Sequence, residues 1–545
     1  MKKWRKWTSV ALTAALGTSM LAGCGGGSDG KGSGANKEGD KGSEVASNLN
    51  KTGFPIVNEP IELTFFTGKS ATNGNKFEET LVWSEYEKMS NMKINFQLIP
   101  FENLTEKRNL VLAGGDYPDA FYSARLSSAD LIRYGQQGVF IKLNDLIDEY
   151  APNFKKLLET YPELRKGLTM PDGNIYSFPS FYDSEFLPML IGTPLWIKQE
   201  WLEKLNMSEP QTIEEFYQYL KAVKETDLNG NGQADEIPYS GAGVGPLIDQ
   251  IKGAWGLGNR GLGHKYVDVD PETNELRFIK TDPRYKEVLE FMHKLYSEGL
   301  IDSEIFTLKG SSLYAKGGEG VFGATIMPNP KTLMNQDGYI GLGALKGPHG
   351  DQIYSHIKVP MVHVGAFAIT DKNEHPEETV RWMDHFYGDE GAKFYFMGQK
   401  DVTYTETADG KLEYIDEITN NPNGLTYDQA LAKYFTWLGG SYPGFVKEQY
   451  FKGSETLPES IETGKKAEPH RVPEIWSSFN YTEEETEFMS SIGSDITSYV
   501  NETEAKFING SLPFSEWDKY VSTVEKMGLD EYMKVYKEAY ERYNK

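Results

Sequence analysis

The chain has 545 residues, more than one ordinary hydrophobic core accommodates, so we expect at least two lobes. Hydrophobic residues make up 39% and aromatic residues 13% of the chain, which excludes a wholly disordered protein. The formal net charge of −24, from 56 Lys and Arg against 80 Asp and Glu, argues against nucleic acid as a partner.

The N-terminus has the parts of a bacterial secretory signal. Four basic residues lie within MKKWRKW, and an apolar run too short to span a bilayer follows them. The run ends in LAGC, which resembles a lipobox, and its Cys24 is the one cysteine of the chain. We therefore predict a lipoprotein signal peptide over 1–23 and an acylated Cys24. The alternative is an ordinary signal peptide with an incidental cysteine.

Residues 24–53 are rich in glycine, serine and charge, which predicts a flexible tether. Strand-like and helix-like patterns then alternate up to the PDAFY segment, and this order is typical of a parallel sheet with helices on its faces. The expected strands cover residues 61–68, 93–100 and 119–123. The expected helices cover 77–91 and a stretch that begins at 103 and is stopped by Gly114 and Gly115.

The rest of the chain continues the mixture of helices and strands. Thr212 and Glu215 form the pattern of a capping box at the start of a helix. Residues 359–370 have a strong strand pattern. Residues 141–168 are expected to be helical, punctuated by Pro152 and Pro162, and residues 375–398 are expected to be a helix pair broken by glycine. Further helices are expected at 195–207, 212–227 and 515–545.

The stretch DLNGNGQADEIP matches the opening of an EF-hand calcium loop, with oxygen-bearing side chains on alternate residues and a glycine at the sharp turn. Pro238 stands where an EF-hand has its final glutamate, so Asp235 or Glu236 must replace it. An ion-free Asn-Gly turn is the alternative; magnesium fits less well, and zinc would need His or Cys. We predict a structural Ca²⁺ held by Asp227, Asn229, Asn231, Gln233, Asp235 and Glu236.

Several segments, in this order, carry a family resemblance: ELTFF, LAGGDYPDAFY, PLWIKQEWLEKL, DLNGNGQADEIP and SEWDKYVSTVEKMGLDEY. Together with the lipobox and tether, they resemble the extracellular solute-binding proteins of family 1, the carbohydrate-binding lipoproteins of ABC importers. The likeness is to the long members found in Gram-positive bacteria, which are related to alginate-binding proteins. In such relatives a similar loop holds calcium.

The resemblance implies a two-lobe, periplasmic-binding-protein-like α/β fold of type II, with mixed sheets flanked by helices and a ligand cleft between the lobes. It implies a first lobe of residues 54–179 plus 356–400 and a second lobe of 180–355 plus 401–545, with GNIYSFPSF and the stretch near Val359 as crossing segments. It also implies an oligosaccharide ligand, ABC importer permease subunits as partners, and a monomer attached by lipid to the extracellular face of the cell membrane.

Flat aromatic side chains can stack on sugar rings, and loops at strand ends commonly line clefts. Any single aromatic residue more often belongs to the core, so glycine- or proline-flanked positions and the first helix are favoured. The candidates for ligand binding are Trp83, Tyr122, Phe181, Tyr182, Trp255, Trp437, Tyr442 and Trp476.

No enzyme motif stands out in the sequence: HExxH and the GxxxxGK[ST] phosphate loop are missing, and no GxSxG stands between a strand and a helix as a nucleophile elbow does. We therefore expect a binding protein rather than an enzyme. Two alternatives stay open, a cell-surface glycoside hydrolase or lyase and a binding protein for a non-sugar solute such as a peptide.

Overall fold

The structure, a computed structural model, describes residues 48–70, 76–233, 235–308, 310–425, 427–436 and 442–545. The signal peptide, Cys24 and Trp437 therefore lie outside the described residues. Residues 48–545 form one unit. Within the described ranges, no helix is both long and apolar enough to cross a membrane.

A mixed six-stranded sheet organises the first part of the fold, in the order β14-β4-β11-β3-β1-β2. β1 pairs in parallel with β2 and β3, as the alternating sequence pattern predicts, whereas β11 runs antiparallel to β3 and β4. Six of the seven residues of β3 are buried, as expected for a strand covered on both faces. The strands are β1 (Ile61–Lys69), β2 (Met92–Pro100), β3 (Ala120–Leu126), β4 (Phe178–Tyr182), β11 (Met361–Ile369) and β14 (Gly444–Val446).

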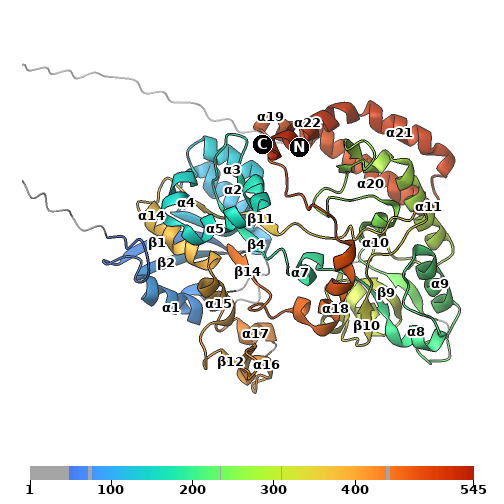
Figure 1. Ribbon diagram of the computed structural model, residues 1–545, viewed down its shortest axis with the longest axis horizontal. Coiled ribbons are helices and arrows are strands. Elements are labelled where there is room, and N and C mark those ends of the chain that lie inside the picture. The colour runs from blue at the N-terminus through green and yellow to red at the C-terminus, as the bar shows by residue number, and fades with distance from the viewer. Residues whose placement is uncertain (1–47, 71–75, 234, 309, 426, 437–441) are drawn as a thin grey trace, which may run out of the picture. The chain divides into compact units, whose positions relative to one another are not determined.

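Helices from two distant parts of the sequence accompany this sheet (Figure 1). Pro152 and Pro162 each stand at the first position of a helix, where a missing N–H costs nothing, so the expected helical stretch of residues 141–168 is three helices. The helices are α1 (Leu81–Ser90), α2 (Leu104–Gly114), α3 (Ser128–Gln136), α4 (Asn144–Tyr150), α5 (Pro152–Thr160), α6 (Pro162–Leu168), α14 (Pro376–Asp384) and α15 (Asp389–Met397).

A smaller sheet of four strands, ordered β10-β5-β9-β6, organises the second part. Its strands are β5 (Leu195–Lys198), β6 (Ile237–Ser240), β9 (Phe322–Ile326) and β10 (Tyr339–Gly341). Its helices are α8 (Gln199–Leu205), α9 (Ile213–Lys224), α10 (Gly245–Ile251), α11 (Pro283–Ser297), α12 (Gly310–Gly318), α13 (Pro330–Met334), α19 (Glu483–Phe488), α20 (Ser494–Asn509), α21 (Trp517–Lys526) and α22 (Leu529–Tyr543). The predicted capping box of Thr212 and Glu215 begins α9.

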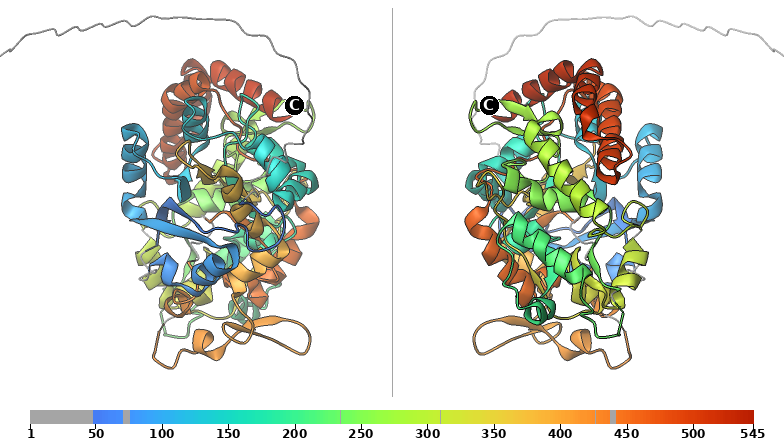
Figure 2. Two further views of the ribbon diagram at one scale, coloured as in Figure 1. Left: turned by 90° about the vertical axis from the view of Figure 1, so that its left-hand side faces the viewer. Right: turned by 90° about the vertical axis from the view of Figure 1, so that its right-hand side faces the viewer.

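Three shorter pieces complete the fold. α7 (Leu187–Ile191) and α18 (Pro458–Ala467) lie between the elements of the two sheets in Figure 1. β7 (Val267–Val269) and β8 (Leu276–Phe278) form a hairpin. A second hairpin, β12 (Tyr404–Glu406) and β13 (Leu412–Tyr414), projects together with α16 (Asp416–Thr419) and α17 (Tyr427–Leu431), as the orange segment in Figures 1 and 2 shows.

The two cores divide the chain differently from the expected lobe boundaries. The first core contains α7 and many side chains of residues 404–475, which the expectation assigned to the second lobe. The second core resumes with Trp476 and includes the C-terminal helices. The reason is a tertiary contact: β14 pairs in parallel with β4, and Phe445 packs on Phe181, with ring centroids 5.5 Å apart. The first crossing accordingly falls at 192–194 rather than within GNIYSFPSF.

Candidate ligand-binding cavity

A cavity of about 1000 Å³ lies where the chain passes between the two sheets. Its wall combines the end of β4, the segment after α7, the segment before β11 and the chain between β14 and α18. The residues that line it are Tyr182, Met189, Gly192, Thr193, Pro328, Thr332, Leu333, Lys358, Val362, Tyr427, Tyr442, Val446, Phe451, Lys452, Gly453, Ser454, Glu455, Thr456 and Leu457.

Four aromatic side chains give the cavity flat apolar surfaces: Tyr182, Tyr427, Tyr442 and Phe451. Tyr442 is held rigidly, because its ring stacks on Tyr395 with centroids 4.8 Å apart and planes at 13°. Two of the four, Tyr182 and Tyr442, are among the predicted ligand-binding residues. The other two, Tyr427 and Phe451, lie in or after segments whose sequences show no strong hydrophobic periodicity.

Three charged side chains face the same cavity. Burial lowers the pKa of Lys358 and of Lys452, and the Glu455 carboxylate opposes part of this effect at Lys358. No pattern in the sequence marks any of the three as a ligand-binding residue. A lysine two residues before Pro360 has no sequence signal of function, and only the path of the crossing segment places Lys358 on the wall.

The remaining aromatic candidates lie elsewhere. Phe181 precedes Tyr182 on β4, so its ring points to the opposite face and packs on Tyr161 at 5.0 Å. Trp83 and Tyr122 belong to the first core, and Trp83 Nε1 donates to Thr436 Oγ1 at 2.7 Å. Trp255 and Trp476 belong to the second core, where they are 3% and 0% exposed.

Core packing accounts for these positions. Trp83 stacks on Trp382 at 5.5 Å, an arrangement joining α1 to α14 that local sequence cannot reveal. Trp476 packs against Phe479 and Tyr540, at 5.2 Å and 5.0 Å. The cavity in this structure is therefore not lined by the candidates Trp83, Tyr122, Trp255 and Trp476.

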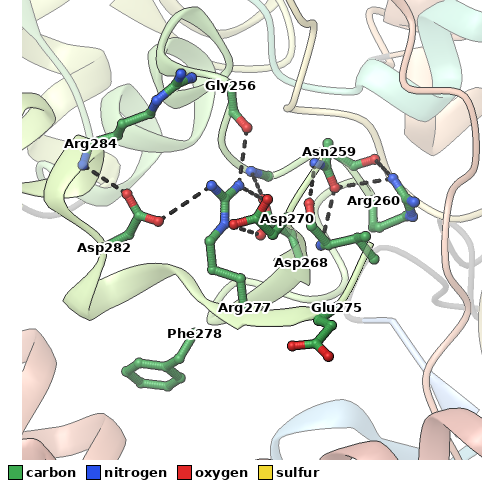
Figure 3. A network of polar contacts seen from close by, with 12 residues as sticks. Gly256, Asn259, Arg260, Asp268, Asp270, Glu275, Arg277, Phe278, Asp282 and Arg284 are labelled. Carbon is green, nitrogen blue, oxygen red and sulfur yellow. Dashed lines mark hydrogen bonds and ion pairs between the residues drawn. The ribbon is translucent and has the colours of Figure 1, made fainter. Parts of the chain in front are cut away.

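A network of polar contacts fixes the glycine-rich segment around Trp255, drawn in Figure 3. Asp268 is fully buried, and Arg277 donates to both of its carboxylate oxygens at 2.9 Å. The same guanidinium reaches Gly256 O at 3.2 Å, and Gly258 N donates to Asp268 at 2.8 Å. The network therefore ties the β7–β8 hairpin to the segment that carries Trp255.

The DLNGNGQADEIP loop is closed by its own side chains. Asp227 accepts from Gly230 N and Gly232 N, each at 2.8 Å, and Asn231 Nδ2 donates to Asp235 at 3.0 Å. Both glycines have φ near +80°, at 77° and 84°, which other residues adopt only with strain. The loop has therefore the sharp turn that an EF-hand opening requires.

One buried oxygen of this loop lacks a partner among the described residues. Glu236 is 7% exposed; its Oε1 accepts from Leu228 N and Asn229 N at 2.6 and 2.8 Å, but Oε2 accepts nothing. In the described ranges, no three His, Cys, Asp or Glu side chains are grouped as a metal site. Carboxylates, amides and a buried orphan oxygen nevertheless fit the hard oxygen ligands that calcium takes.

The chain has two α/β parts, and its cavity is lined by both parts and by the segments that connect them. This arrangement is that of the solute-binding proteins with a type II periplasmic-binding-protein-like fold. The family model of the bacterial extracellular solute-binding proteins matches residues 69–393. The chain belongs to this family, which confirms the resemblance found in the sequence.

Known relatives support this placement over most of the chain. The fructooligosaccharide ABC transporter substrate-binding protein FusA of Streptococcus pneumoniae is 30% identical over 556 residues, covering 98% of each protein. Lipoprotein LipO of Bacillus subtilis is 24% identical, covering 82% of this chain and 86% of LipO. The structure of a FusA EF-hand mutant with fructo-nystose superposes with a TM-score of 0.70 at 28% identity, covering 89% of this chain and 99% of that one.

Proposed function

We propose that this protein captures an oligosaccharide in the cavity between its two sheets and delivers it to an ABC importer. The observation that carries the proposal is the cavity wall, which combines four aromatic side chains with hydroxyl, ammonium and carboxylate groups. Sugars present apolar faces and hydroxyl edges, so a site for them needs both kinds of surface. The 30% identity to a fructooligosaccharide-binding protein over 98% of the chain supports the same substrate class.

The cavity favours binding over hydrolysis. Glycoside hydrolases use two carboxyl groups on either side of the scissile bond. Among the described residues that line the cavity, Glu455 is the single carboxylic acid, and its Oε2 accepts from Ser454 Oγ at 3.1 Å. The proposed role is therefore that of a binding protein without catalytic activity, whose importer supplies the energy for transport.

We further propose that the loop of residues 227–236 holds a structural Ca²⁺. Asp227, Asn229, Asn231, Asp235 and Glu236 would supply side-chain oxygens, and Gln233 its carbonyl. The orphan Oε2 of Glu236 supports this proposal, because a buried carboxylate oxygen without a partner is costly. The ion would stabilise the end of α9 and would take no part in ligand binding.

Acylation of Cys24 would hold the protein at the extracellular face of the cell membrane. The lipobox-like LAGC and the lipoprotein relative LipO support this proposal. Expression of the full chain with Cys24→Ser in a Gram-positive host tests it. The variant should leave the membrane fraction for the medium, whereas an unchanged distribution would contradict lipid anchoring.

The proposed function is tested by calorimetric titration of the mature chain with kestose, nystose, an oligogalacturonide and a control peptide, followed by chromatography of each sugar. We expect saturable one-to-one binding of at least one oligosaccharide and recovery of that sugar intact. Shortened products would show an enzyme instead. Binding of the peptide alone would show a protein for non-sugar solutes.

A further inference from the structure

We propose that Lys358 is a ligand-contacting residue of the cavity, whose ammonium group donates hydrogen bonds to an oxygen of the bound oligosaccharide. The inference rests on the proposed function and adds a specificity-determining residue to it. Lys358 lies on the segment between β10 and β11, where the chain crosses from one sheet to the other, and it lines the cavity.

The ammonium of Lys358 is half-buried and has no hydrogen-bond or ion-pair partner among the described residues. Glu455 on the same wall interacts with it electrostatically but does not form an ion pair with it. Burial lowers the pKa of this lysine, which reflects the cost of keeping a charge away from water. A buried charge of this kind is retained at a cost in stability unless a partner arrives.

Gly192 makes the space that the ammonium occupies. A Cβ built on Gly192 would clash with Lys358 Nζ, and the backbone there has a φ of 67°, in the left-handed region. The ammonium group of Lys358 therefore lies against the backbone of the segment after α7, at the cavity wall.

Other polar groups of the wall are already used inside the protein. Thr332 Oγ1 donates to Asn329 O at 3.1 Å, and Thr456 Oγ1 donates to Gly453 O at 2.9 Å. Tyr442 Oη, in contrast, is buried and has no partner among the described residues. Lys358 thus places an unused donor on the wall, and an oxygen-rich ligand would satisfy it.

The oxygen could belong to a hydroxyl group of a neutral sugar or to the carboxylate of an acidic one. Both accept hydrogen bonds from an ammonium group, and the carboxylate adds an opposite charge. The titrations described above distinguish these two sources when they are repeated on variants of Lys358 with kestose, nystose and the oligogalacturonide.

Three variants are compared with the wild-type chain by calorimetry. Lys358→Met removes the ammonium and keeps the length of the side chain, and Lys358→Arg keeps the charge. Lys537→Met changes an exposed lysine on α22 and serves as the matched control. Lys358→Met should weaken sugar binding about 10- to 100-fold, Lys358→Arg should weaken it less, and the control should bind like the wild type.

A melting curve without ligand separates a binding role from a structural one. Because the ammonium has no partner to lose, Lys358→Met should melt at the same temperature as the wild type or higher. A loss confined to the oligogalacturonide identifies a carboxylate as the partner, and a loss with kestose or nystose identifies a hydroxyl group. Unchanged affinity in Lys358→Met, or a lower melting temperature that alone accounts for weaker binding, overturns the inference. A wild-type chain that binds none of the sugars contradicts the proposed function itself.

Discussion

Single aromatic side chains have two distinct roles in this protein, and their neighbours decide which. Tyr182 and Tyr442 face the cavity, whereas Trp83 and Trp476 are enclosed by other rings and by Thr436 or Arg260. All four were candidates in the sequence, because a glycine or proline flank or a place on the first helix favours a cleft but does not show what covers a ring.

Replacement of Tyr182 should change ligand affinity, whereas replacement of Trp83 should change stability. Tyr182→Ala removes a flat surface of the cavity and should weaken oligosaccharide binding about 10-fold. Trp83→Phe removes the bond to Thr436 and part of a packed ring, and should lower the free energy of unfolding by about 1–3 kcal/mol with unchanged affinity. Calorimetry and urea denaturation measure the two quantities. A 10-fold loss of affinity in a fully folded Trp83→Phe would contradict this assignment.

Asp384 makes stability depend on pH. It is fully buried and accepts from Phe154 N at 2.8 Å at the start of α5, and burial raises its pKa to about 6. Since the ordinary pKa is 3.8, the folded chain binds the proton more tightly than the unfolded chain. The stability that this proton supplies is present below pH 4 and is lost as the pH rises through 6.

The wild type and Asp384→Asn should therefore differ in their pH dependence. The difference between their free energies of unfolding, wild type minus variant, should fall between pH 4 and pH 6 and stay constant above pH 7. The expected fall is on the order of 1–3 kcal/mol. Urea denaturation of both proteins across this range measures it. A difference that does not vary with pH would show that Asp384 is ionised throughout.

At the scale of elements, hydrophobic periodicity predicted the strands and helices of the first half well. β1 and β2, and β11 further along the chain, begin and end within two residues of the expected ranges, because successive side chains of a strand point to opposite faces and give the sequence a period of two. The cavity wall could not be predicted, because it consists of connecting segments whose positions depend on β4 pairing with β14 across more than 250 residues.

The salt bridge between Asp268 and Arg277 should be essential for the hairpin that holds the glycine-rich segment. Arg277→Met leaves a buried carboxylate without its charge partner and should cost about 3–5 kcal/mol in urea denaturation. The double variant Asp268→Asn with Arg277→Met should recover part of this loss, because no buried charge remains. Equal losses in the single and double variants would contradict this explanation.

The calcium loop should raise the melting temperature without changing sugar affinity. Addition of CaCl₂ to the chelated protein at 100 times the dissociation constant should stabilise it by about 2.7 kcal/mol. Asp227→Asn together with Asp235→Asn should abolish the rise, whereas Asp518→Asn, at an exposed position on α21, should keep it. Scanning calorimetry with CaCl₂ and MgCl₂ checks this. A calcium-independent melting temperature in the wild type would contradict the ion site.

At the scale of the whole molecule, the described unit has two larger sheets, two main cores and connecting segments that pass between them. The family and the α/β fold could be predicted from the sequence, because the order of segments extends along the whole chain. The assignment of residues 404–475 to the first core could not be predicted from the sequence, because it depends on tertiary contacts such as that of Phe445 with Phe181.

The most direct measurement is a crystal structure of the mature chain with an oligosaccharide that calorimetry shows to bind. We expect sugar density in the cavity, with a ring against Tyr182 or Tyr442 and an oxygen within hydrogen-bond distance of Lys358 Nζ. Density instead in the cavity beside α6 and α22, which Arg165 and Arg542 line, would contradict this expectation.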